Sequence, residues 1–300
     1  MIARQPPIYV SGKTVLRYGF LEGDAVVDAD RAVYDPQTSN APTAFAENGS
    51  RANTVALVLN ESEIRSLTGL DDLNECAERL IYDKAADVVV VKAGTRGALV
   101  FDQNCARYIV PAFRSERVFK IGTGDVFSAM FSLHWGHEHR NPAEAAELAS
   151  RAVAAYCSDR QLPVAPSALR KLQSVPLGQA GQVLLEGSVT TLGHRYTMEE
   201  ARFQLRDLGA VVCAPQLDGN SAGEITATLV LGDAVDEEAE ARLRRLDPAV
   251  PMVVLLEDGD SGTIDWAPPN TQFTSDFASA LYFAVWASIR PTDSQTARVS

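Results

Sequence analysis

The chain has 300 residues, which is enough for about two domains of ordinary size. Its hydrophobic content of 46% and charged content of 22% are those of a globular protein with a sizeable core. The formal net charge of −12 argues against general binding to nucleic acid or to an anionic membrane, because an acidic surface repels both polyanions.

Cysteine usage and the N-terminus predict a cytoplasmic protein. The four cysteines are scattered without a C-x-x-C pair, which fits a reduced chain better than a disulfide scaffold (Cys76, Cys105, Cys157 and Cys213). The first residues lack the apolar core of a signal peptide, and no run is long enough to span a bilayer. We therefore expect no membrane partner, and the sequence leaves a homo-oligomer open.

The first 60 residues predict short strands and then a buried one. Residues 25–27 and 32–34 are short β-like pieces, and Asp35-Pro36-Gln37 indicates a turn after a strand. A run of β-branched and apolar residues over 54–59 predicts a buried strand.

A helix is expected directly after that strand. Asn60 is followed three residues later by Glu63, the spacing of a reciprocal helix cap.

A second buried strand is predicted over 87–91, followed by a glycine-containing turn and a strand over 98–101. The turn, Lys92-Ala93-Gly94-Thr95-Arg96-Gly97, indicates a tight hairpin. Further strands are expected over 107–112 and 116–119.

The stretch Gly122-Thr123-Gly124-Asp125 opens a helix expected to run from Thr123 to about Trp135. Glycines let the backbone approach a ligand closely, and the first N–H groups of a helix attract anions. Asp125 lies in the first turn, where a carboxylate is electrostatically favoured. An anion cradle beside a carboxylate is what phosphoryl transfer requires. The alternative is a glycine turn whose aspartate only caps the helix.

The motif resembles the second signature of the ribokinase-like (PfkB) sugar kinase family. Its usual form is D-T-x-G-A-G-D-x-F, and this chain has Phe119 and Lys120 where Asp-Thr would stand. The resemblance implies that Asp125 is the catalytic base and that the backbone of Gly122, Thr123 and Gly124 forms the anion hole.

The same resemblance implies roles for two further motifs. Asn60 and Glu63 would act as an N-x-x-E motif that organises metal and phosphate. Lys92, Gly94 and Gly97 would lie near the nucleotide. ATP and Mg2+ are then the expected cofactors, and a sugar or nucleoside is the expected small-molecule substrate.

The resemblance covers about residues 25 to 170, the C-terminal half of such a kinase. It implies a ribokinase-like partial α/β domain over 1–176, in which the nucleotide side of a site is visible and the acceptor side is not. We therefore expect a sugar or nucleoside kinase, and three alternatives stay open. A partner supplies the second half of the site, this form is inactive, or the protein binds nucleotides without catalysis.

Three histidines in six residues, His134, His137 and His139, invite a metal interpretation. They fall at an expected helix end without carboxylate or cysteine partners, which favours a solvated loop. An alanine-rich helix is expected next, over 142–156.

The second domain is expected over 181–300, after a loose stretch rich in proline and glycine. Strands and helices alternate in it, which predicts a small Rossmann-like parallel-sheet α/β domain. Strands are expected at 182–187, 210–215, 227–231 and 252–256. A first helix is expected to begin at the capping box formed by Thr197 and Glu200. Two further helices are expected over 236–246 and 273–288.

Two segments of this domain, 191–215 and 258–263, resemble the nucleoside 2-deoxyribosyltransferase-like family. The resemblance implies a nucleoside site, and hence N-glycosidic bond transfer or hydrolysis as an alternative function. Its residues would be Glu186, His194, Arg195, Asp258, Asp260, Ser261, Gly262, Thr263 and Asp265. Trp266 stands where the family places its nucleophilic glutamate, and Asp265 lies one residue early.

Overall fold

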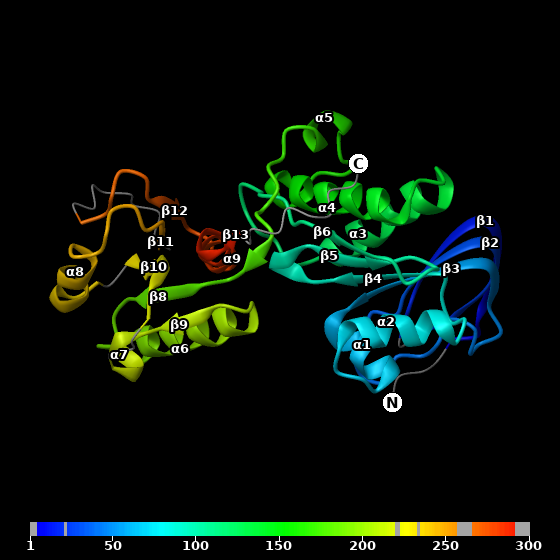
Figure 1. Cartoon of the computed structure of the whole chain (residues 1–300), viewed down its shortest axis with the longest axis horizontal. Coiled ribbons are helices and arrows are strands. Elements are labelled where there is room, and N and C mark those ends of the chain that lie inside the picture. Colours follow the sequence, from blue (N-terminus) through cyan, green and yellow to red (C-terminus); the bar gives the residue numbers. More distant parts are fainter. Residues whose placement is uncertain (1–4, 21–22, 220–222, 233–234, 257–265, 292–300) are drawn as a thin grey trace. The chain divides into compact units, whose positions relative to one another are not determined.

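The computed structural model describes residues 5–20, 23–219, 223–232, 235–256 and 266–291 (Figure 1). These residues form two compact units. The first contains the described residues up to 115 together with 121–174, and the second contains 116–120 and those from 175 onward.

The first unit is built on a mixed sheet. Among the described residues of this unit, six strands lie in the order of the sequence, β1 to β6. The first four run parallel, and β5 and β6 are antiparallel to their neighbours. Their bounds are β1 (Ile8–Tyr18), β2 (Ala25–Asp35), β3 (Arg51–Asn60), β4 (Val88–Lys92), β5 (Ala98–Phe101) and β6 (Arg107–Val110).

Helices cover both faces of this sheet (Figure 1). On one face, α1 (Glu61–Thr68) and α2 (Leu73–Tyr82) pack Ile64 and Cys76 against strand residues such as Leu57. On the other face, α3 and α4 bring Phe131 and Ala149 against Val58 and its neighbours. The helices of that face are α3 (Thr123–Phe131), the π-helical turn η2 (Ser132–His137) and α4 (Pro142–Asp159), which α5 (Pro166–Leu169) follows. Burial on both faces explains why β3 and β4 are continuous apolar runs rather than alternating ones.

The second unit contains a parallel sheet. Within its described residues, five strands lie in the order β12-β11-β10-β8-β9, and every pair is parallel. The strands are β8 (Gln182–Glu186), β9 (Val211–Cys213), β10 (Ile225–Leu231), β11 (Met252–Leu255) and β12 (Gln272–Thr274). The helices are α6 (Leu192–Asp207), α7 (Pro215–Asp218), α8 (Glu237–Leu243) and α9 (Phe277–Ser288), and β7 (Gly178–Gln179) pairs with β13 (Arg290–Pro291).

Several expected elements of the first unit are corrected. Strand β1 was not expected at all, and the two short pieces at 25–27 and 32–34 are parts of one long strand, β2. The expected strand at 116–119 is absent from the described structure, where this segment has no regular hydrogen bonding.

The cap predicted at Thr197 is also wrong. Helix α6 begins six residues earlier than predicted, after Thr191, whose side chain accepts from the amide of His194. Thr197 therefore lies inside the helix, where its hydroxyl donates to the carbonyl of Gly193 at 3.1 Å. The last helix, in contrast, begins later than predicted. Phe273 belongs to β12, and Asp276 is the N-cap residue of α9.

The histidine stretch is not a solvated loop throughout. His134 is buried in the π-helical turn, and its Nδ1 lies 2.9 Å from a carboxylate oxygen of Glu138. Across the described residues, no group of three or more His, Cys, Asp or Glu side chains could hold a metal ion. None of the described helices has both the length and the apolar character needed to cross a membrane.

Candidate functional site

The candidate site lies where four neighbouring parallel strands end. The last residues of β1, β2, β3 and β4 are Tyr18, Asp35, Asn60 and Lys92. Because these strands run in one direction, their last residues share one edge of the sheet, the edge at which open α/β sheets bind ligands. All four side chains can form hydrogen bonds, although Asn60 and Lys92 directly follow buried apolar runs.

The start of α3 is fixed against this edge by two hydrogen bonds. The Tyr18 hydroxyl donates to the carbonyl of Asp125 at 2.9 Å. The Ser128 hydroxyl donates to Asp35 Oδ2 at 2.6 Å. The glycine turn and the strand ends are therefore neighbours in the first unit.

A buried carboxylate lies beneath the turn. Asp35 is fully buried, and its Oδ2 accepts from Lys92 Nζ at 2.8 Å as well as from Ser128. Burying an unpaired carboxylate is very costly, so Lys92 compensates this charge. A Cβ added to Gly124 would lie 3.7 Å from Lys92 Nζ, which shows that the ammonium group lies against the glycine turn.

The turn itself requires glycine. Gly122 has a φ of +77°, in the left-handed region, and a Cβ there would come within 3.3 Å of the Tyr156 hydroxyl. Gly122 is the N-cap residue of α3 and has no side chain to cap the helix. The first N–H groups of a helix have no partners within the helix, so an anion can bind them.

Asp125 is exposed beside this turn, and the side-chain amide of Gln37 donates to its Oδ1. Burial raises the pKa of Tyr18 to about 12, and the negative charges of Asp125 and Asp35 add to the effect. Tyr18 therefore stays protonated near neutral pH and keeps donating to the Asp125 backbone. The Asp125 carboxylate has oxygen lone pairs available for a hydroxyl group.

Asn60 and Glu63 form the expected helix cap. Asn60 N donates to Glu63 Oε2 at 2.7 Å, and Glu63 N donates to Asn60 Oδ1 at 2.8 Å. Burial raises the pKa of the Glu63 carboxyl, while the Asn60 N–H and Lys92 act in the opposite direction. The capping interpretation is confirmed, and the role in organising metal and phosphate stays a prediction.

The turn at 92–97 is a hairpin, because β4 and β5 are antiparallel. Gly97 has a φ of +86°, and a Cβ there would lie 2.1 Å from the carbonyl oxygen of Val110. Gly94 begins the short 3-10 turn η1 (Gly94–Arg96) and also has positive φ. Close packing explains Gly97, and proximity of this turn to a nucleotide stays a prediction.

The nucleoside site expected in the second unit is mostly outside the described residues. Asp258, Asp260, Ser261, Gly262, Thr263 and Asp265 all lie there.

The described members of that set are not joined. Glu186 is buried at the end of β8, where Arg242 donates to both its carboxylate oxygens at 2.7 and 3.0 Å. Burial raises the pKa of the Glu186 carboxyl against the opposing effect of Arg242. His194 and Arg195 lie in the first turn of α6, and no hydrogen bond or ion pair joins them to Glu186 within the described structure.

Sequence reasoning missed four residues of the first site: Tyr18, Asp35, Gln37 and Ser128. Asp35 and Gln37 were interpreted only as a turn after a strand. The available signal was position, since a polar residue that ends a buried parallel strand lies at the ligand-binding edge.

Comparison with known proteins supports one family for the first unit. Residues 25–163 match the family described as pfkB family carbohydrate kinase. No curated protein matches the chain. The match ends before residue 175, where the main part of the second unit begins, and the resemblance to nucleoside 2-deoxyribosyltransferases receives no support from these comparisons.

Solved structures similar to this chain include sugar kinases. Ribokinase from Thermotoga maritima is 23% identical over 46% of this chain and 47% of its own, with a TM-score of 0.38. Arabidopsis thaliana ribokinase complexed with ribose and ATP is 20% identical over 47% of each chain, with a TM-score of 0.38. Fructokinase from Vibrio cholerae, in a form bound to fructose, ADP and calcium, is 21% identical over 49% and 50%, with a TM-score of 0.37. The chain spans about half the length of these proteins.

Proposed function

We propose, from the pfkB family carbohydrate kinase domain at residues 25–163, that this chain transfers a phosphoryl group from ATP to a hydroxyl of a sugar or nucleoside. One observation carries the proposal. Asp125 is exposed in the first turn of α3, directly after a glycine turn against which the Lys92 ammonium lies. This arrangement combines a proton acceptor with an anion-binding helix start.

The residues present fit a phosphate chain. Gly122 and Gly124 leave the helix start open to a close approach, and the Lys92 ammonium group, which is paired with Asp35, lies beside it. Mg2+ bound to ATP neutralises charge that develops on the phosphates during transfer. Because Mg2+ keeps several water ligands and is bound mainly through phosphates, Glu63 would orient its water shell rather than enclose it.

The reaction follows from these roles. The acceptor oxygen forms a bond to the γ-phosphorus while the bond between that phosphorus and the bridging oxygen of the β-phosphate breaks. ADP leaves with the bonding electron pair. The acceptor proton moves to the Asp125 carboxylate. The backbone of residues 122–124 would stabilise the negative charge on the transferred group.

ATP turnover with a panel of sugars and nucleosides tests the proposal. We expect Asp125→Asn to lower turnover by roughly 10²- to 10⁴-fold, the usual contribution of a general base. Asp28→Asn is the matched control, because it removes an exposed carboxylate of β2 whose ion pair in the described structure is with Arg51. Equal turnover in the wild type and in the Asp125 variant would exclude Asp125 from the reaction.

The same assay separates a kinase from a binding protein. Thermal stabilisation by ATP without turnover of any acceptor would favour the non-catalytic alternative.

We further propose that the domains are 1–176 and 181–300. Limited proteolysis between residues 174 and 182 should then release two stable fragments.

A further inference from the structure

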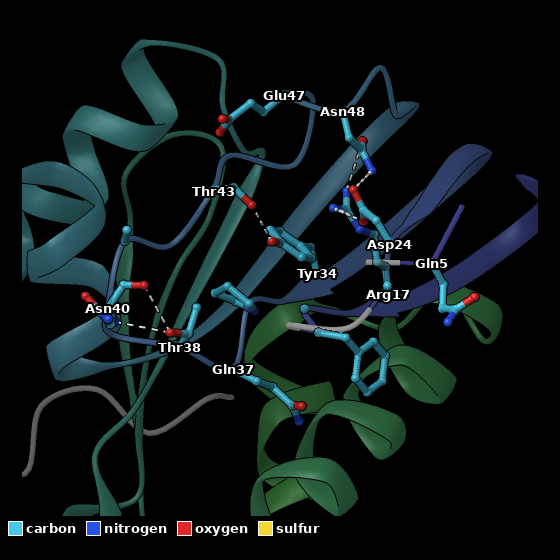
Figure 2. A pocket seen from close by; sticks show the side chains of 15 residues that line it. Gln5, Arg17, Asp24, Tyr34, Gln37, Thr38, Asn40, Thr43, Glu47 and Asn48 are labelled. Carbon is cyan, nitrogen blue, oxygen red and sulfur yellow. Dashed lines mark hydrogen bonds and ion pairs between the residues drawn. The ribbon is translucent and has the colours of Figure 1, made fainter. Parts of the chain in front are cut away.

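Two exposed apolar side chains of the first unit lie beside the candidate site. Phe20 lines the cavity of about 500 Å³ that Figure 2 shows, and Gln37, which donates to Asp125, lines the same cavity. Ile121 directly precedes the glycine turn. A ligand of the candidate site can cover both side chains. The second unit has another group of exposed apolar side chains, which that site does not explain.

This group forms a stripe along α6 of the second unit (Figure 1). Leu192, Tyr196 and Phe203 are 86%, 72% and 67% exposed. Their spacings of four and seven residues return to nearly the same side of the helix, because each residue advances an α-helix by about 100°. The opposite side of α6 faces the core and carries three fully buried residues (Met198, Ala201 and Leu205). Packing within the second unit therefore does not account for the α6 stripe.

The α6 stripe is large enough to be a contact surface. An aromatic side chain offers about 150–250 Å², so the three side chains together expose roughly 400 Å². Contiguous apolar patches of about 300–600 Å² are the largest on typical monomers and often bind another molecule. Two such stripes packed together, with their polar rims, would bury roughly 1,000 Å², which is the lower limit for a specific interface. This area suits a weak dimer.

The charges of α6 favour a second copy of the chain as the partner. The net charge of −12 opposes self-association over most of the surface. On α6, however, three arginines balance three acidic residues (Arg195, Arg202, Arg206, Glu199, Glu200 and Asp207). Two copies of this helix can therefore approach each other without net repulsion between them.

Two antiparallel copies of α6 match each other about a twofold axis. With the axis between Thr197 and Met198 along the helix, Leu192 of one copy lies level with Phe203 of the second copy, because both are equally far from the axis. Tyr196 then lies beside Tyr196 of the second copy. Each apolar side chain of the stripe meets an apolar side chain.

The same axis pairs opposite charges. Arg195 and Glu199 lie on one side of the stripe, and the axis brings Arg195 of each copy beside Glu199 of the other. Arg195 is exposed and has no ion pair among the described residues, and Glu199 pairs with Arg202 at the surface. Both side chains can take a new partner at low cost, because exposed ion pairs are weak. Every contact occurs twice, as in an isologous interface.

We propose that the α6 stripe is the interface of a symmetric homodimer, in which two α6 helices pack antiparallel with Tyr196 at the centre and Arg195 opposite Glu199. The inference does not depend on the proposed kinase function, because α6 belongs to the second unit.

Sedimentation velocity of the full chain tests the inference over about 1 to 100 μM, the range in which a weak interface dissociates. We expect the wild type to change from monomer to dimer as its concentration rises. Tyr196→Glu should keep the chain monomeric, because it places two carboxylates beside the axis. The matched control is Tyr82→Glu, since Tyr82 is an exposed tyrosine at the end of α2 in the first unit, and it should dimerise as the wild type does.

Two charge reversals test the pairing itself. Arg195→Glu and Glu199→Arg each place like charges opposite one another in a homodimer. Each should weaken dimerisation by at least about tenfold, because each changes two symmetry-related contacts. An equimolar mixture of the two variants should form a mixed dimer, because the carboxylates of one chain then face the guanidinium groups of the other. Recovery in the mixture also shows that both variants are folded.

Four results would overturn the inference. They are a wild type that stays monomeric over the whole range, a dimer that persists in Tyr196→Glu or in both charge reversals, a mixture of the two reversals that stays monomeric, and equal loss of the dimer in Tyr82→Glu. Recovery of the dimer in the mixture alone would support it, because a contact within one chain cannot be restored by a second chain.

Discussion

Replacing Lys92 by methionine tests the buried charge pair that supports the candidate site. The Asp35 side chain is 1% exposed and that of Lys92 is 20% exposed, with 2.8 Å between Nζ and Oδ2. Without the ammonium group, Asp35 keeps hydrogen bonds from the Ser128 hydroxyl and, at 3.3 Å, from the backbone N–H of Gln37. Breaking a buried pair by removing one partner costs about 3–5 kcal/mol, because the remaining charge stays buried.

The control is Arg51→Met, which removes an ion pair of the same length. Arg51 and Asp28 are also 2.8 Å apart, but their side chains are 81% and 59% exposed. Exposed pairs contribute about 0–1 kcal/mol, so we expect almost no effect. The double variant with Asp35→Asn and Lys92→Met should recover most of the lost stability, because it leaves no uncompensated charge.

Urea unfolding of the first unit measures the difference. A chain with two units need not unfold in one step, so the signal must come from the first unit alone. Trp135 lies in that unit, and replacing Trp266 and Trp286 by phenylalanine leaves it as the reporter among the three tryptophans of the sequence. With a slope of about 2 kcal/mol/M, Lys92→Met should lower the midpoint by about 1.5–2.5 M urea. Similar shifts in the Lys92 and Arg51 variants would refute the buried-pair argument.

Three further predictions concern the same unit. Tyr18 should ionise near pH 12, seen as a phenolate absorbance change that Tyr18→Phe lacks and that Asp125→Asn moves to lower pH. Since its folded pKa is raised, its contribution to stability is complete below pH 10, the ordinary tyrosine pKa, and is lost as the pH rises toward 12. Gly122→Ala and Gly49→Ala should each lower the free energy of unfolding by about 1–2 kcal/mol, because both glycines have positive φ. Only Gly122→Ala should weaken ATP binding in calorimetry, because its Cβ meets Tyr156, whereas Gly49 faces open space. Gly97→Ala should destabilise the unit by more than about 2 kcal/mol in urea, since overpacking adds to its positive φ, whereas Gly69→Ala, which shares only the positive φ, should cost less.

The sequence predicted those elements whose local pattern matched their environment. The apolar runs of β3 and β4 are buried on both faces, and the cap of α1 depends on two residues three positions apart. The strands are determined by burial of apolar side chains, and the cap is determined by a contact between residues close in sequence. Strand β1 was missed because most of its residues are exposed or half-buried, so it carries no apolar run.

The candidate site was predicted only where a single segment contains it. The glycine turn and the carboxylate beside it lie within four consecutive residues, so Gly122 and Asp125 could be identified from their spacing. The pair of Asp35 with Lys92 joins residues 57 positions apart, and Ser128 is 93 positions from Asp35. These contacts depend on which strands become neighbours, and the pattern of one segment does not contain that information.

Two carboxylates approach the start of α3, and burial decides which of them could accept a proton from an acceptor. Asp35 is fully buried, its charge is compensated by Lys92, and no ligand hydroxyl can reach it without displacing that pair. Asp125 is exposed, and the bond to its carboxylate comes from the neutral amide of Gln37. An acceptor hydroxyl can replace a neutral donor at far lower cost than it can replace a charged one in a buried site. Asp35→Asn should therefore reduce stability through Lys92 while leaving the proton acceptor in place, whereas Asp125→Asn should remove that acceptor with little effect on folding.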